Sequence, residues 1–212
     1  MKYDQIIWDF NGTILDDVDV GIRAVNFLLK ERGLKTIDSL EYYHSIFGFP
    51  IKEYYSKAGF DFSKESYESV APEWVEKYLE YEPEAGLCKD VITAMDTFKS
   101  LNIDQYLVSA TEINMLISQL KRRNIYDYFK GIYGLDNIHA GSKAHIASEV
   151  VAGLSGKTVM IGDTVHDAEC AIAAGADVIL VAAGHQSFER LKSTGSVTVH
   201  SLKEAIDIII GD

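Results

Sequence analysis

The sequence predicts an α/β fold, in which a parallel sheet carries helices on both faces and a small helical module is inserted after the first strand. Short β-branched runs that end in small or polar residues alternate with segments of helical length in the second half of the chain. This alternation is typical of a parallel sheet that is buried on both faces. The first such run is separated from the others by a long stretch with apolar residues at helical spacing only.

Five runs are predicted to be strands, and they occupy residues 5–10, 104–110, 158–163, 178–184 and 197–201. Four segments are predicted to be core helices, and they occupy residues 90–100, 112–124, 143–152 and 167–174. Ligands of parallel sheets bind at the carboxyl ends of the strands. The polar residues that follow these runs are therefore the candidate site residues.

The inserted module spans residues 16–83, so the predicted core consists of residues 1–15 and 84–212. One apolar helical face is formed by Val18, Ile22, Val25 and Leu29. Asp16 or Asp17 can cap this helix at its N-terminus. A second face is formed by Tyr67, Val70, Trp74, Tyr78 and Tyr81. The many acidic residues between positions 61 and 84 are interpreted as the solvated side of an amphipathic helix rather than an acidic binding surface.

Composition excludes several classes of protein. The chain has 212 residues and a formal net charge of −12, a balance that repels nucleic acids and anionic membrane surfaces. The most apolar window, residues 170–184, is too short to span a membrane. The two cysteines, Cys88 and Cys170, lie far apart in the chain without the spacing of a metal or redox motif, so reduced thiols and a cytoplasmic location are expected.

Two predicted strands each end in an aspartate. Asp9 ends the apolar run of IIWDFNGTILDD, where Gly12 permits a sharp turn, and Asp163 ends that of VMIGDTVHD. Carboxylates at the tips of two parallel strands can meet and bind a hard cation such as Mg²⁺. For Asp9 alone, a role as a turn former or helix cap is an equal alternative.

The motifs together resemble those of the haloacid dehalogenase superfamily, in its phosphoglycolate phosphatase-like and β-phosphoglucomutase-like branch. The first family motif is matched by Asp9, Asn11, Gly12, Thr13, Ile14, Leu15 and Asp16. The fourth motif is matched by Gly162, Asp163, Thr164 and Asp167. Ser109 and Lys143 match the second and third motifs. The resemblance implies a Rossmann-like core, with residues 16–83 as the helical cap domain of the branch.

The resemblance also implies a Mg²⁺-dependent phosphohydrolase that acts on a small phosphorylated metabolite. Asp9 is then the nucleophile and forms an aspartyl phosphate. The carboxylates of Asp9 and Asp163 and the backbone carbonyl of Asn11 are the expected metal ligands. The remaining expected roles are phosphate binding by Ser109, Lys143, Gly12 and Thr13, support of the metal site by Asp167, and a substrate contact in the cap by Lys52. For Lys52, a solvated helix lysine is the preferred alternative. A monomer or homodimer is expected, without nucleic acid or membrane partners.

One residue departs from the family pattern. The family has an acid two residues after the nucleophile, and this chain has Asn11, whose amide cannot act as a general acid or base. A slow native phosphatase is the preferred interpretation, and in that case Asn11→Asp should raise turnover. The alternatives are a non-catalytic protein that binds metal and phosphate, a phosphonatase-like enzyme that cleaves a carbon–phosphorus bond with Lys52 as Schiff base, and a phosphotransferase.

Overall fold

The computed structural model describes residues 3–136 and 143–211. Its centre is a six-stranded sheet in the order β5-β4-β1-β6-β7-β8, and every neighbouring pair is parallel. The strands are β1 (Gln5–Trp8), β4 (Asp104–Glu112), β5 (Gly131–Leu135), β6 (Thr158–Gly162), β7 (Asp177–Val181) and β8 (Val197–Val199). The α/β fold with a parallel sheet is thereby confirmed.

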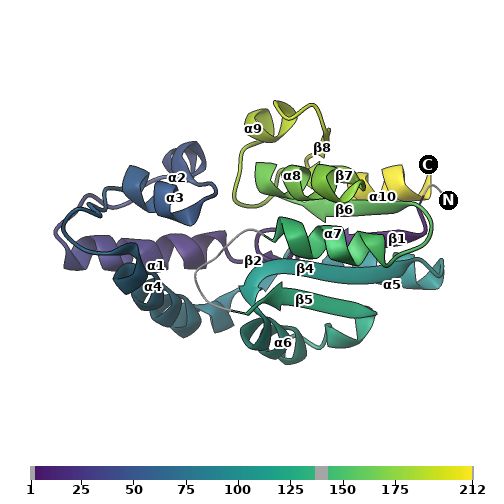
Figure 1. Ribbon diagram of the computed structural model, residues 1–212, viewed down its shortest axis with the longest axis horizontal. Coiled ribbons are helices and arrows are strands. Elements are labelled where there is room, and N and C mark those ends of the chain that lie inside the picture. The colour runs from purple at the N-terminus through teal and green to yellow at the C-terminus, as the bar shows by residue number, and fades with distance from the viewer. Residues whose placement is uncertain (1–2, 137–142, 212) are drawn as a thin grey trace.

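Helices cover both faces of this sheet (Figure 1). Alternate strand residues point to opposite faces, so Ile6 and Trp8 belong to one buried cluster and Ile7 to another. The first cluster includes residues of α5 (Val91–Ser100), α6 (Ile113–Arg122) and α10 (Leu202–Ile210). The second includes residues of α7 (Ala144–Ala152) and α8 (Val165–Ala174). A short helix, α9 (Phe188–Lys192), packs beside α8 through Leu191.

The cap helices lie together at one end of the molecule, away from the two chain termini (Figure 1). They are α1 (Val18–Glu31), α2 (Leu40–Ile46), α3 (Ile51–Ala58) and α4 (Tyr67–Tyr81), followed by the 3₁₀ turn η1 (Glu82–Glu84). A second 3₁₀ turn, η2 (Tyr126–Tyr128), belongs to the core. The two predicted apolar faces are those of α1 and α4, which pack against each other.

Two chain segments join the cap to the core, and they pair as a small antiparallel ribbon of β2 (Leu15–Asp16) and β3 (Gly86–Leu87). The sequence analysis did not find this ribbon, because strands of two residues carry no periodicity. It also missed β5, whose sequence GIYGL holds two glycines and alternates poorly. The first strand ends at Trp8, two residues earlier than predicted, because the carbonyl of Phe10 accepts hydrogen bonds from Ile14 and Leu15 and closes a turn.

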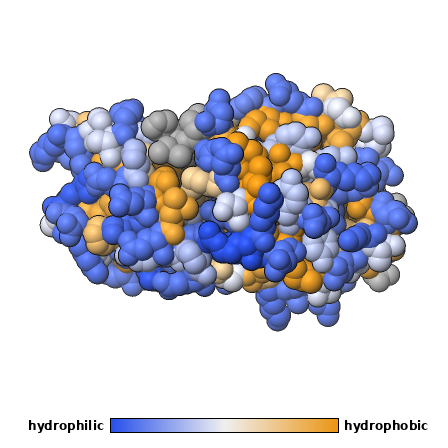
Figure 2. All heavy atoms as spheres, turned by 90° about the horizontal axis from the view of Figure 1, so that it is seen from below, coloured by the Kyte–Doolittle hydropathy of each residue, from blue (hydrophilic) through white to orange (hydrophobic). Residues whose placement is uncertain are grey.

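The acidic residues of the cap are mostly exposed, as the solvated-face interpretation requires. Figure 2 shows hydrophilic side chains over much of one face of the molecule, with hydrophobic ones gathered in patches between them. Glu82 is the exception, since it is fully buried and forms ion pairs with Arg122 and Arg123 of the core. Within the two described ranges, no helix is long and apolar enough to cross a membrane.

Candidate active site

The buried strand β1 delivers Asp9 to the edge of the sheet that faces the cap, where the residue is 7% exposed. The chain then turns sharply at Gly12, which has a φ of +74°. A Cβ atom at this position would overlap the Asp163 carboxylate. Glycine is therefore required at position 12 both for its backbone conformation and for the close approach of Asp163.

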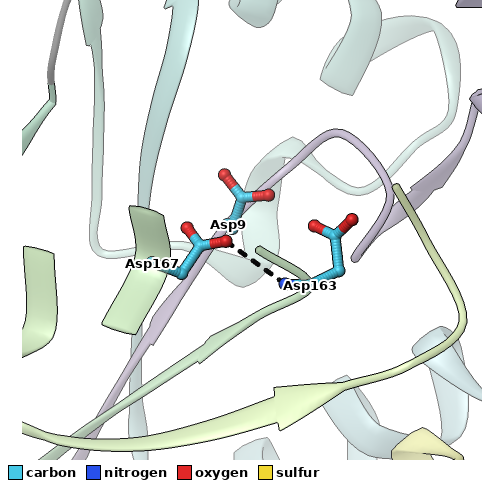
Figure 3. A group of neighbouring side chains, drawn as sticks. All are labelled: Asp9, Asp163 and Asp167. Atoms are coloured by element: carbon cyan, nitrogen blue, oxygen red, sulfur yellow. Dashed lines mark hydrogen bonds between the residues drawn. The ribbon is translucent and has the colours of Figure 1, made fainter. Parts of the chain in front are cut away.

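Asp163 follows β6, and Asp167 lies in the first turn of α8. Asp167 completes a capping box with Thr164, because each residue's side chain bonds the other's backbone N–H. Its Oδ2 atom also accepts a hydrogen bond of 3.2 Å from the backbone N–H of Asp163 (Figure 3). The helix cap thus fixes Asp167 beside the strand tip, and the carboxylates of Asp9, Asp163 and Asp167 gather in one place (Figure 3).

The three carboxylates fit a hard divalent cation. One oxygen from each lies within 4.8 Å of the others, and all three side chains are buried. The Oδ1 atom of Asp167 lies 2.7 Å from the Lys143 ammonium, which also contacts Asp9. Three buried carboxylates against one lysine leave negative charge uncompensated, and oxygen ligands of this type suit Mg²⁺.

The pKa values of this cluster reflect the same imbalance. Burial, reinforced by Asp167, raises the pKa of Asp9 well above its usual range. Burial also raises the pKa of Asp163 to about 6, against the opposing effect of His185. For Asp167, burial favours the neutral form, but the Lys143 ammonium outweighs burial and lowers the pKa. A bound cation would favour the ionised form of each carboxylate.

Lys143 lies directly before α7 and is 3% exposed. Its ammonium group contacts Asp9 Oδ1 and lies 2.7 Å from Asp167 Oδ1. Burial lowers the pKa of this lysine, but Asp167 and Asp9 reverse the effect and raise it above its ordinary value. The ammonium is therefore charged, and it lies directly beside the Asp9 carboxylate.

The hydroxyl groups that the sequence analysis singled out also lie in this site. Thr13 Oγ1 donates to Asp163 Oδ1 at 3.0 Å and lies 3.4 Å from Asp9 Oδ2. Ser109 is buried near the end of β4, where its hydroxyl bonds Thr111 and lines the cavity above Asp9. The structure thus brings both hydroxyls together with Asp9, Asp163 and Lys143.

Asn11 is held by hydrogen bonds at both ends of its amide. Its Nδ2 group donates to Asp17 Oδ2 at 2.7 Å and to the Tyr78 hydroxyl at 2.9 Å. Its Oδ1 atom accepts from the Thr111 hydroxyl at 2.8 Å. The amide therefore has a fixed orientation, with its NH₂ group toward the carboxylate of Asp17.

Asp17 was predicted as a possible helix cap, and the structure corrects this. Asp17 occupies the N-cap position of α1, but its carboxylate makes no capping hydrogen bond. It accepts instead from the Gly12 N–H at 2.9 Å and from the Tyr78 hydroxyl at 2.7 Å. Asp17, the second of two adjacent aspartates, therefore belongs to the site.

His185 is a site residue that the sequence analysis missed. It lies in the loop after β7, and its backbone N–H donates to Asp163 Oδ2 at 2.6 Å. Its imidazole lies 3.4 Å from Asp17 Oδ1 and 2.6 Å from the Tyr43 hydroxyl of the cap. Burial lowers the pKa of this histidine, but Asp17 outweighs burial and raises it to about 9. Its position after a predicted strand was the only available signal in the sequence.

A cavity of about 160 Å³ lies above Asp9 and is closed on its other side by the cap (the cap contributes residues of α1 to α4). Its cap wall is largely aromatic, and includes Tyr43, Phe47, Phe49, Tyr54, Tyr55, Tyr67, Trp74 and Tyr78. Lys52 does not line it. This lysine is exposed on α3, with its ammonium 5.6 Å from the centre of the Phe62 ring. Its predicted substrate contact thus has no geometric support, since an exposed helix lysine is what the alternative interpretation describes.

Comparisons with known proteins show which family and which solved structures this chain resembles. A family model described as haloacid dehalogenase-like hydrolase matches residues 6–181. A search of curated proteins found no match.

Among solved structures, a predicted phosphatase from Clostridium acetobutylicum is 21% identical, with a TM-score of 0.79 and 100% of both chains covered. A predicted phosphoglycolate phosphatase from Haemophilus somnus is 15% identical, with a TM-score of 0.74 and 99% of each chain covered. Protein Tyrosine Kinase A from Mycobacterium tuberculosis is 20% identical, with a TM-score of 0.81 over 97% of this chain and 98% of that one. At these identities the structural matches show a common fold.

Proposed function

Because the chain belongs to the haloacid dehalogenase-like hydrolase family, we propose that it is a Mg²⁺-dependent phosphohydrolase. Its substrate is a small phosphorylated metabolite, and Asp9 forms an aspartyl phosphate during the reaction. The observation that supports this proposal most strongly is the buried cluster of Asp9, Asp163, Asp167 and Lys143 beneath the cavity between core and cap. A nucleophile, a cation site and a phosphate-binding ammonium lie together there, as phosphoryl transfer requires.

Asp9 performs the covalent step. Its carboxylate oxygen attacks phosphorus, a bond forms between the two, and the bond from phosphorus to the leaving oxygen breaks. Water then hydrolyses the aspartyl phosphate and releases inorganic phosphate. The attack requires the ionised form of Asp9. Lys143 favours this form, but burial and Asp167 outweigh it and keep the pKa of Asp9 raised, so ionisation would need a bound cation as well.

The carboxylates of Asp9 and Asp163 and the backbone carbonyl of Asn11 would hold Mg²⁺, with Asp167 supporting them. When bound, the cation reduces the repulsion between Asp9 and the phosphate and stabilises developing charge. Lys143 binds an equatorial phosphate oxygen, and the Ser109 hydroxyl supplies a further donor when it turns away from Thr111. The Gly12 N–H already donates to Asp17 and the Thr13 hydroxyl to Asp163, so these two groups hold the carboxylates of the site. The Thr164–Asp167 capping box keeps Asp167 oriented while phosphate enters and leaves.

Phosphate release from phenyl phosphate tests this proposal. We expect release that requires Mg²⁺ and falls by at least about 10³-fold in Asp9→Asn. Asp19 is an exposed aspartate on α1, so Asp19→Asn is the matched control and should retain activity. Intact mass after acid quench should show one added phosphate on the wild type and none on Asp9→Asn. Activity that persists in Asp9→Asn would overturn the proposed nucleophile. No release from a panel of phosphomonoesters, together with no adduct, would favour a non-catalytic protein.

A phosphotransferase is the second candidate, and Asn11 favours it. The fixed amide cannot act as a general acid or base. The water that attacks the aspartyl phosphate therefore has no base at this position. An intermediate that water attacks slowly survives long enough to reach another acceptor. Transfer of phosphate to added alcohols, measured beside phosphate release, separates the two activities. The phosphonatase interpretation has less support, because Lys52 does not line the cavity.

A further inference from the structure

We propose that the cavity selects small phosphomonoesters whose leaving group is uncharged and apolar or aromatic, and that it rejects leaving groups that carry a carboxylate. This inference rests on the proposed phosphohydrolase function and names its substrate class. It starts from the wall of the cavity that faces Asp9. Phe47, Phe49, Tyr54 and Trp74 all come from the cap and all line this wall. The ring centres of Phe47 and Tyr54 lie 5.1 Å apart, and those of Trp74 and Tyr78 lie 4.8 Å apart.

No free cation faces the leaving group among the lining residues that the structure describes. Lys143 is the only lysine or arginine among them, and Asp9 and Asp167 already engage its ammonium. The other charged candidate is His185, which lies between Asp17 and the Tyr43 hydroxyl. A carboxylate on the leaving group would therefore enter an aromatic wall without a partner, with Asp17 as a further negative charge in the lining.

Two cap cations that could have served such a carboxylate are placed elsewhere. Arg32 is held by Glu65 at 2.7 Å and by Glu73 at 2.9 Å. Lys52 is exposed, near the Phe62 ring. Neither residue lines the cavity. The branch that the sequence resembles includes phosphoglycolate phosphatases, whose substrate carries a carboxylate, so this chain departs from that expectation.

Sugar phosphates also fit poorly, because three of the hydroxyl groups that line the cavity already form hydrogen bonds within the protein. The Tyr43 hydroxyl bonds His185, and the Tyr78 hydroxyl bonds Asp17 and Asn11. On the core side, Thr111 donates to Asn11. A sugar hydroxyl that met these groups would have to break one of their bonds or remain unpaired, and either outcome weakens binding.

A single aromatic ring fits both the size and the chemistry of the cavity. Its volume is about 160 Å³, so beside a phosphate at Asp9 and Lys143 it has room for a small leaving group, of the order of one ring, against the cap wall. Rings in proteins associate by offset stacking or edge-to-face contact, and the cap wall offers both ring faces and ring edges. The aromatic end of the substrate would lie against the cap while its phosphate lies at Asp9 and Lys143.

Benzyl phosphate and 4-carboxybenzyl phosphate form a matched pair for the test. They differ by one carboxylate that lies far from the reacting oxygen, so the bond that breaks is nearly the same in both. With Mg²⁺ and the full chain, we expect kcat/KM for benzyl phosphate to exceed that for the carboxylate by on the order of 10²-fold, because the carboxylate is buried without a partner. 2-Phosphoglycolate should also be a poor substrate.

Val75→Lys tests the cause of this selectivity. Val75 lines the cavity from α4 and is partly exposed, so the helix can accept a lysine there. A cation at this position should raise kcat/KM for 4-carboxybenzyl phosphate about tenfold or more and should not raise it for benzyl phosphate. Val75→Met is the uncharged control of similar length and should leave the preference unchanged.

The outcomes separate this inference from the proposed function. Turnover of both substrates at equal rates, or faster turnover of the carboxylate, would overturn the inference and leave the phosphohydrolase intact. No release from either substrate and none from phenyl phosphate would overturn the proposed function, and binding then decides the inference. Trp74 lines the cavity whereas Trp8 is fully buried in the core, so benzylphosphonate should quench the fluorescence of Trp74 in the presence of Mg²⁺. Equal quenching by 4-carboxybenzylphosphonate at the same concentration would contradict the selectivity.

Discussion

Asn11 and Asp17 form a pair in which each residue depends on the other. The Asn11 amide donates to a carboxylate that also accepts from the Gly12 N–H and the Tyr78 hydroxyl. An aspartate at position 11 would place an acceptor where a donor now stands, beside a second buried carboxylate. The amide at position 11 is thus matched to Asp17, and its loss of acid–base function accompanies that match.

The Asn11→Asp variant should therefore behave differently from the expectation that the sequence alone supports. We expect it to lower the free energy of unfolding by about 1–3 kcal/mol, because one of two adjacent carboxyls, of which that of Asp17 is buried, must take up a proton. Turnover should gain little in this variant. The double variant Asn11→Asp with Asp17→Asn restores a donor and an acceptor and should recover stability and turn over faster than the wild type. Urea unfolding and steady-state phosphate release measure the two effects.

A single Asn11→Asp variant that keeps wild-type stability and turns over faster than the wild type would show that Asp17 places no restraint on position 11. Asp16→Asn, at the exposed neighbour of Asp17, is the control for a change of charge in this loop.

At the scale of elements, the loop between α2 and α3 rests on the core at several points. The Arg190 guanidinium of α9 donates to the backbone carbonyls of Phe47 at 2.5 Å and His44 at 3.4 Å. The Phe49 ring stacks on His166 of α8 with 4.7 Å between ring centres. Phe47 and Phe49 also line the cavity, so these contacts determine how far the aromatic side chains of the cap lie from Asp9.

Arg190→Met should loosen this part of the cap. We expect KM to rise several-fold to about tenfold with a smaller change in kcat, because the variant loses charge-assisted hydrogen bonds that hold the wall and leaves Asp9 and Lys143 untouched. Lys192→Met, on the exposed side of the same helix, is the matched control and should keep the wild-type KM. A fall in kcat at constant KM would mean that Arg190 acts on the reaction itself.

For the whole molecule, the charge of the buried cluster links stability to cation and pH. Burial raises the pKa of Asp163 to about 6. A carboxyl whose folded pKa is raised stabilises the protein when it is protonated, and this stability is lost as pH rises toward 6. Above that pH the ionised carboxyl needs a cation. If the cluster binds Mg²⁺ as proposed, the cation should therefore stabilise the folded chain most where Asp163 is ionised.

Thermal unfolding with and without Mg²⁺ measures this linkage. At pH 7.5 (about 1.5 units above the Asp163 pKa) and at about one hundred times its Kd, Mg²⁺ should raise Tm by roughly 5–10 °C. The shift should shrink as pH falls through about 6. Asp163→Asn should abolish it, and Asp177→Asn, an exposed aspartate at the start of β7, should not. An equal shift in Asp163→Asn would place the cation elsewhere.

The sequence by itself determined the parallel sheet, the helices on its two faces, and the residues at the strand tips. Strand runs and helical periodicity are local signals, and Asp9 and Asp163 could be placed because carboxyl ends of parallel strands share one edge. The motifs carried Lys143, Ser109, Thr13 and Asp167 into the same site.

Only the tertiary structure decided what surrounds Asn11 and what forms the cavity wall. Asp17 looked like a helix cap because its immediate neighbours favour that role, but its carboxylate bonds residues that are distant in the chain, such as Tyr78. His185 and the cap aromatics have no local motif. The loop after β7 brings His185 to Asp163, and the cap aromatics face Asp9 because the cap packs over this end of the sheet. Lys52 had the right charge in the right module, and the fold places it on the exposed side of α3. Periodicity tells which side of an element is apolar, whereas the ligand that a cavity accepts depends on which elements pack around it.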